Sequence, residues 1–186
     1  MKQAVCAGIV AWLVTAVVSD AGTKTGMNEL QIQGSFSLQT TDQDDDRNYA
    51  ASATLIYSYF FAPQVSVGAS GMVVGSLHDP EGDSETKSAS LFFLGRFDFY
   101  LTDGSKPLVP YFGPHGGGVS YTVDNGDETE SSVTFAYGGH AGLKFFVGEH
   151  TSWNVEGNYT EYRPETDDSD QKLRILQMLV GYSYYF

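Results

Sequence analysis

Apolar and polar residues alternate along most of this chain. In the segment 29–40, an apolar side chain at nearly every second position is separated from the next by a small polar one, and 131–146 and 152–163 repeat the pattern. A period of two is typical of a β-strand with one apolar and one polar face. Eight such segments can be traced: 29–40, 49–61, 64–76, 88–101, 107–121, 131–146, 152–163 and 172–186. The sequence therefore predicts an all-β fold.

The connections between these segments are of two kinds. Those at 62–63, 102–106 and 147–151 are short, whereas the other four are longer and acidic. The long connections follow strands one, three, five and seven. This alternation predicts an eight-stranded, antiparallel, up-and-down β-barrel with every long connection at one end.

The pattern alone does not decide which face points inward. A soluble lipocalin-like barrel has an apolar interior, whereas a transmembrane β-barrel turns its apolar face toward lipid. The polar face is built of small neutral residues that suit a narrow interior: Gln31, Gln33, Ser35, Ser37, Ser52, Ser66, Ser70, Ser88 and Ser90. Aromatic residues gather near the short turns, as in an interfacial girdle: Tyr57, Tyr59, Phe60, Phe61, Phe97, Phe99, Phe145, Phe146, Trp153, Tyr182, Tyr184 and Phe186. Both features favour the transmembrane barrel.

The facing of the fifth strand stays open. Pro110, Pro114 and the glycines 116–118 interrupt its alternation. Proline and glycine inside a strand are typical of bulges or of close backbone approach.

The N-terminus has the features of a secretory signal peptide. A positive charge at Lys2 precedes an uncharged apolar run from Ala4 to Val18, and small residues up to Ala21 suit a peptidase site. We therefore expect a signal peptide over 1–21 and a barrel domain over 22–186. The single cysteine, Cys6, falls within the signal peptide, so a disulfide framework is excluded for the predicted mature chain.

The formal net charge of −13 comes from the long connections. Sixteen of the 23 acidic residues lie there: Asp42, Asp44, Asp45, Asp46, Asp79, Glu81, Asp83, Glu85, Asp124, Asp127, Glu128, Glu130, Glu165, Asp167, Asp168 and Asp170. Without a basic stripe, binding to nucleic acid is excluded. Carboxylates could bind divalent cations such as Ca²⁺, although no EF-hand spacing is present and solvated loops are the alternative interpretation.

The chain ends in VGYSYYF, with Met178, Val180, Tyr182, Tyr184 and Phe186 on one face of the last strand. This ending resembles the C-terminal signature of bacterial outer-membrane barrels. YFFAPQVSVGASG (59–71), PYFGPHGGGVSY (110–121), FAYGGHAGLKFFV (135–147) and WNVEGNYTEY (153–162) also resemble strands of small opacity-type and outer-membrane protein A/X-type barrels. The resemblance implies a place in the outer membrane of a Gram-negative bacterium, with lipid and lipopolysaccharide around the barrel. It also implies that the barrel-assembly machinery reads the last strand, which then pairs with the first.

Charged residues on the polar face form a candidate interior cluster: Arg96, Asp98, His140, Lys144 and Glu156. Ions inside a narrow barrel must pair, because an isolated buried charge costs several kcal/mol. A gate or proton-linked pore is one interpretation, and a polar plug that fills the barrel is the other.

A second cluster lies next to the last long connection, where Arg163, Lys172 and Arg174 share one face. They could contact lipopolysaccharide phosphates, or simply extend toward water at a membrane edge.

Taken together, these patterns predict a non-enzymatic, monomeric outer-membrane barrel without a cofactor, which contributes to envelope integrity or surface interaction. The alternatives are a narrow cation-preferring channel, a barrel enzyme that modifies lipid A, and a secreted lipocalin-like binder. For the enzyme, no convergent Ser/His pair is recognisable among the four histidines.

Overall fold

The computed structural model describes residues 23–40, 47–79, 86–102, 106–124, 129–163 and 172–186. The predicted signal peptide and most of the acidic residues of the long connections therefore lie outside the described residues. No helix within the described ranges is long and apolar enough to cross a membrane.

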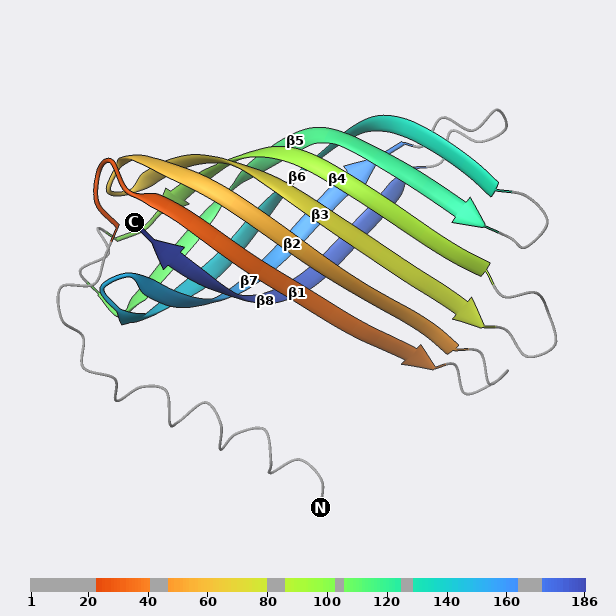
Figure 1. Cartoon of the computed structure of the whole chain (residues 1–186), viewed down its shortest axis with the longest axis horizontal. Helices are drawn as coiled ribbons and strands as arrows, with labels where there is room; N and C mark the ends of the chain where they lie inside the picture. The colour runs from red at the N-terminus through yellow and green to blue at the C-terminus, as the bar shows by residue number, and fades with distance from the viewer. Residues whose placement is uncertain (1–22, 41–46, 80–85, 103–105, 125–128, 164–171) are drawn as a thin grey trace, which may run out of the picture.

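Eight antiparallel strands form a closed barrel in chain order, with β1 against β8 (Figure 1). Their bounds are β1 (Asn28–Thr40), β2 (Arg47–Ala62), β3 (Val65–Asp79), β4 (Thr86–Tyr100), β5 (Leu108–Asp124), β6 (Thr129–Gly148), β7 (Thr151–Tyr162) and β8 (Leu173–Tyr185). The predicted all-β, eight-stranded, up-and-down fold is confirmed.

The barrel has two different ends. The strand ends that the short connections join lie at one end of the barrel, here called the turn end. The strand ends that the long connections join lie at the other, the loop end (Figure 1). The chain terminus lies at the turn end, where Asn28 and Phe186 exchange backbone hydrogen bonds of 2.8 and 3.0 Å. Just before β1, Gly26 has a φ of 88°, a left-handed conformation that favours glycine, and its N–H donates to the Phe60 carbonyl at 2.7 Å.

The apolar face points outward. Leu176, Val133 and Phe36 keep 81%, 73% and 72% of their surface exposed, while Gln31 and Ser66 are buried in the interior. This is the facing predicted for a transmembrane barrel. It is the opposite of a lipocalin-like barrel, whose apolar side chains point into the interior.

Two members of the predicted aromatic girdle are misplaced. Phe60 and Phe146 are buried inside the barrel, whereas their neighbours Tyr59, Phe61 and Phe145 are exposed. Consecutive residues of a strand point to opposite faces, so a run of adjacent aromatic residues cannot all face lipid.

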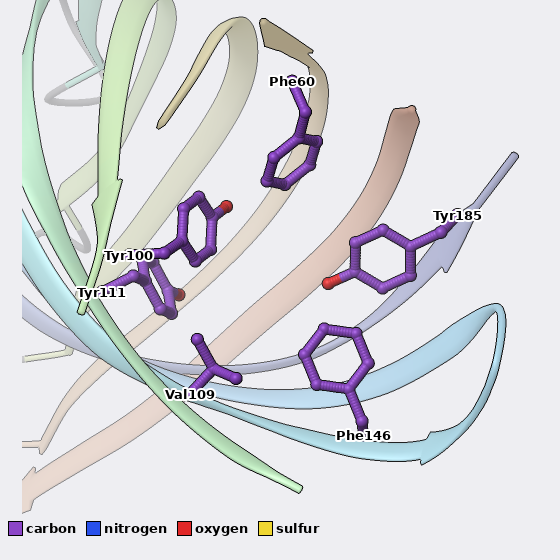
Figure 2. Close-up of a cluster of buried hydrophobic side chains, with 6 residues drawn as sticks. All are labelled: Phe60, Tyr100, Val109, Tyr111, Phe146 and Tyr185. Carbon is purple, nitrogen blue, oxygen red and sulfur yellow. The ribbon is translucent and has the colours of Figure 1, made fainter. Parts of the chain in front are cut away.

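The interior is layered, as the inward-facing residues of β4 illustrate. From the loop end these include Ser90, Phe92 and Leu94, then Arg96 and Asp98, then Tyr100. Phe92 and Leu94 belong to an apolar cluster near the loop end with Met72, Val119, Ala136 and Tyr162. Tyr100 belongs to a cluster at the turn end with Phe60, Val109, Tyr111, Phe146 and Tyr185, shown in Figure 2. A charged layer separates the two.

Candidate functional site

The structure places all five residues of the predicted interior cluster inside the barrel. Arg96 and Asp98 come from β4, His140 and Lys144 from β6, and Glu156 from β7, and each is at most 7% exposed. The five residues divide into two groups, one centred on Arg96 and one centred on Lys144.

Arg96 bridges two carboxylates. Its Nε and Nη2 donate to Asp98 Oδ1 at 3.0 and 2.8 Å, and Nη2 also donates to Glu156 Oε2 at 3.0 Å. Two hydroxyl groups add to this: Ser66 Oγ donates to Asp98 Oδ2 at 3.0 Å, and the Tyr111 hydroxyl donates to Glu156 Oε2 at 2.7 Å. Glu156 Oε1 is buried and has no hydrogen-bond partner among the described residues. Charge-assisted hydrogen bonds of this kind offset much of the cost of burying the ions.

A pair of histidines extends this part of the network. His140 Nε2 lies 2.6 Å from Asp98 Oδ1, and its ring stacks on that of His115 with centroids 5.7 Å apart. His115 Nε2 contacts Thr160 Oγ1 at 3.0 Å. Gly138 makes room for His115, because a Cβ at that position would lie 2.7 Å from His115 Nε2.

The prediction had omitted His115, because the facing of the fifth strand was open. In the structure the odd-numbered residues Val109, Tyr111, His115 and Val119 are buried, while Phe112 is 46% exposed. The alternation of buried and exposed residues therefore continues through both prolines, so His115 points into the barrel.

Lys144 forms the second part. Its Nζ contacts the Glu29 carboxylate and donates to Gln31 Oε1 at 3.0 Å. The same Nζ lies 5.1 to 5.7 Å from the ring centroids of Tyr111, Tyr100 and Tyr185, within the range of cation–π attraction. Glu29 was also missed, although it continues the alternation of Gln31 and Gln33 by one step.

This network pairs the buried charges of β1, β4, β6 and β7 with one another. Among the described residues, no group of three His, Cys, Asp or Glu side chains is arranged to hold a metal ion.

A second charged group lies on the outer wall at the loop end. Lys172 Nζ and Arg174 Nε approach the Glu161 carboxylate at 3.2 and 3.4 Å. The Tyr137 and Tyr159 hydroxyls donate to the same carboxylate at 2.8 and 3.2 Å. Arg163, also exposed, lies two residues beyond Glu161. We call Arg163, Lys172 and Arg174 the outer cation cluster. Glu161, which holds two of them, was not predicted.

The last strand presents one continuous apolar row to the outside. Met178, Val180, Tyr182, Tyr184 and Phe186 are between 41% and 71% exposed. Tyr182 packs against Trp153 with ring centroids 5.5 Å apart.

Comparisons with known proteins find this architecture in other barrels. No family model matches the chain. No curated protein matches it in sequence. Among solved structures, the chain is similar to Neisserial surface protein A, with a TM-score of 0.59 and 13% identity over 87% of this chain and 98% of that one. OprG of Pseudomonas aeruginosa gives a TM-score of 0.51 and 16% identity over 89% and 98% of the two chains. Ail of Yersinia pestis, solved in complex with the heparin analogue sucrose octasulfate, gives 0.54 and 15% over 87% and 99%.

The fold is that of these proteins, and the outward apolar wall is the surface that a lipid bilayer requires. The chain has the fold of the small eight-stranded outer-membrane β-barrels.

The acidic residues predicted as cation ligands fall mostly outside the described residues. Asp79, Asp124 and Glu130 belong to the parts of β3, β5 and β6 that lie at the loop end. The predicted binding of divalent cations stays a prediction.

Proposed function

We propose that this outer-membrane barrel is a non-enzymatic surface protein with a plugged interior, which contributes to envelope integrity or to interactions made by its acidic connections. The observation that carries this proposal is the paired charge network, which occupies the barrel between two layers of packed apolar and aromatic side chains. An eight-stranded barrel is only wide enough for its own side chains. We propose that the turn end faces the periplasm and the loop end faces outward.

Bilayer conductance tests the plug against the alternative of a cation-preferring channel. We expect the refolded protein to give no steady conductance in planar bilayers, because we propose that paired ions and packed aromatic rings block the interior. Bilayers that receive the same detergent without protein are the control. Steady, cation-selective single-channel steps would contradict the proposal and support the channel.

We further propose that the outer cation cluster contacts lipopolysaccharide phosphates. Glu161 supports this by holding Lys172 and Arg174 side by side at the loop end, where lipid headgroups would lie. In the alternative interpretation, these long side chains only extend their charged ends toward water, and no phosphate is bound.

Neutralising the outer cation cluster tests this contact. In Arg163→Gln/Lys172→Gln/Arg174→Gln, we expect the affinity for purified lipopolysaccharide to fall about ten-fold, since each exposed ion pair contributes roughly 0.2–1 kcal/mol. Titration of the protein in nanodiscs by microscale thermophoresis measures the change. Lys24→Gln/Lys106→Gln is the control, because it removes two exposed cations elsewhere. Equal affinities for the two variants would contradict the contact.

The acidic connections limit the partners that this surface fits. Ail was solved with a sulfated heparin analogue. The connections of the present chain carry sixteen acidic residues against Arg47 and Lys87, and their field repels polyanions. We therefore propose cationic partners or divalent cations for the acidic connections, as distinct from the outer cation cluster on the wall below them.

The outward row of β8, from Met178 to Phe186, supports the proposal that the barrel-assembly machinery reads this strand. Once β8 pairs with β1, the barrel needs no further chain to cover an edge at its turn end, which is in keeping with a monomer.

A further inference from the structure

The pairing that closes the barrel covers only part of its height. Within the described residues, β1 pairs with β8 from Glu29↔Tyr185 to Gly34↔Val180. By contrast, β1 pairs with β2 as far as Thr40↔Arg47, and β8 pairs with β7 as far as Leu173↔Tyr162. Figure 1 shows β1 and β8 diverging toward the loop end.

This open part of the seam begins within the membrane. A transmembrane strand needs roughly 9–11 residues to cross the hydrocarbon. The β1–β8 ladder spans residues 29–34 of β1, counted from the turn end, so the two strands separate before that height is reached. An unpaired strand edge that faces hydrocarbon leaves N–H and C=O groups unsatisfied, which is costly in lipid.

A cavity of about 500 Å³ lies at this opening and is here called the seam cavity. Its lining combines both faces of the wall: Val74, Tyr121 and Ile175 point inward, whereas Phe36, Leu176 and Met178 point outward. A cavity lined by the inner and outer faces of one strand can exist only where that strand has an open edge. The seam cavity therefore connects the loop-end half of the interior with the lipid phase.

The lining is amphipathic. Apolar side chains from β3, β5 and β8 are accompanied by the hydroxyl groups of Ser35, Ser76 and Ser88, and Arg174 lies at the rim with 65% of its side chain exposed. The volume falls in the range of about 300–1,000 Å³ found for small-molecule sites.

We propose that the seam cavity binds a free single-chain amphiphile with a carboxylate head, such as a long-chain fatty acid, which enters from the lipid phase between β1 and β8. The alkyl chain packs against Ile175 and Tyr121, and the carboxylate accepts hydrogen bonds from Arg174 and from the unpaired strand edge. This inference does not depend on the plug, which lies closer to the turn end, and it shares only Arg174 with the proposed lipopolysaccharide contact.

A disulfide test asks whether the seam is open in a bilayer. Phe36 and Met178 would be partners if the β1–β8 register continued, and Ile32↔Tyr182 is an observed pair of the same register and facing. In a Cys6→Ser background, refolded into lipid vesicles and oxidised, we expect Ile32→Cys/Tyr182→Cys to form a disulfide and Phe36→Cys/Met178→Cys to form little. The bond requires Cα atoms within about 7 Å. Equal yields would show a closed seam and overturn the proposal.

Photo-crosslinking tests whether a fatty acid enters the seam cavity. The probe is hexadecanoic acid with a diazirine in its chain, and adducts are mapped by mass spectrometry. Outward residues are labelled by any lipid, so the informative adduct is on inward-facing Tyr121. We expect this adduct to form, to be competed by hexadecanoate more than by its methyl ester, and to fall severalfold in Ile175→Trp, which fills the cavity. Val133→Trp, on the outer wall of β6, should leave it unchanged.

Each other outcome of the crosslinking overturns part or all of the proposal. Adducts confined to outward residues would show that no chain enters, and this result would leave the plug untouched. Equal competition by the acid and its methyl ester would show that the carboxylate is not recognised. An adduct that persists in Ile175→Trp would place the probe outside the seam cavity.

Discussion

Replacing Arg96 with methionine is expected to lower the free energy of unfolding of the barrel by about 3–5 kcal/mol, the usual cost of leaving a buried charge without its partner. Arg96 donates to Asp98 and Glu156, and all three residues are at most 7% exposed. The variant leaves two carboxylates close together without the guanidinium between them. Equilibrium unfolding in urea, carried out in lipid vesicles and followed by tryptophan fluorescence, measures the loss.

Two further variants make this test specific. Arg174→Met removes an arginine that is 65% exposed, and it should change the free energy of unfolding by no more than about 0.5 kcal/mol. Arg96→Met/Asp98→Asn/Glu156→Gln removes the charges together and should recover most of the loss, because uncharged groups of similar shape can replace a buried ion pair. If Arg96→Met costs no more than Arg174→Met, the network does not stabilise the barrel as described.

Lys144→Met is expected to cost a similar amount, about 3–5 kcal/mol. The change removes the ammonium that contacts Glu29 and lies beside the rings of Tyr111 and Tyr185, and it leaves the Glu29 carboxylate buried near the turn end. The same urea unfolding measures the effect, with Lys106→Met as the control on an exposed lysine.

A double-mutant cycle separates the ion pair from simple packing. Lys144→Met/Glu29→Gln should be more stable than Lys144→Met alone, since the second change removes the unpaired charge. Additive losses in the double variant would mean that Lys144 and Glu29 are not coupled, and that Lys144 acts through the aromatic rings alone.

The strands could be predicted because each one carries its own alternation. Their facing followed from the small polar residues at Gln31, Gln33 and Ser52, which suit only a narrow interior. The aromatic girdle could be predicted only in part, because adjacent aromatic residues of one strand point to opposite faces. Phe60 and Phe146 therefore turned out to be interior residues.

The charged residues of the interior could be predicted in part from the sequence. Parity assigns Glu29 to the same face as Gln31, so its pairing with Lys144 could have been proposed from the pattern. His115 required the facing of β5, which prolines and glycines obscured. The choice of partners depends on the shear between strands, because Arg96 and Glu156 belong to strands that are not neighbours in the sheet.

The opening between β1 and β8 could not have been predicted. The resemblance of the C-terminal pattern implies that the first and last strands pair. In the structure, β1 and β8 pair near the turn end. How far the ladder extends depends on the relative tilt of two strands that are remote in sequence, and no local pattern encodes it.

The most direct test of the central claim, a membrane-spanning barrel with an apolar outer wall, is refolding from urea into detergent micelles or lipid vesicles, followed by electrophoresis of unheated and boiled samples. We predict a band that migrates differently before and after boiling, and that forms only when detergent or lipid is present, because large apolar side chains such as Leu176 and Val133 are exposed on the wall. A protein that folds and stays in solution without detergent would contradict the account.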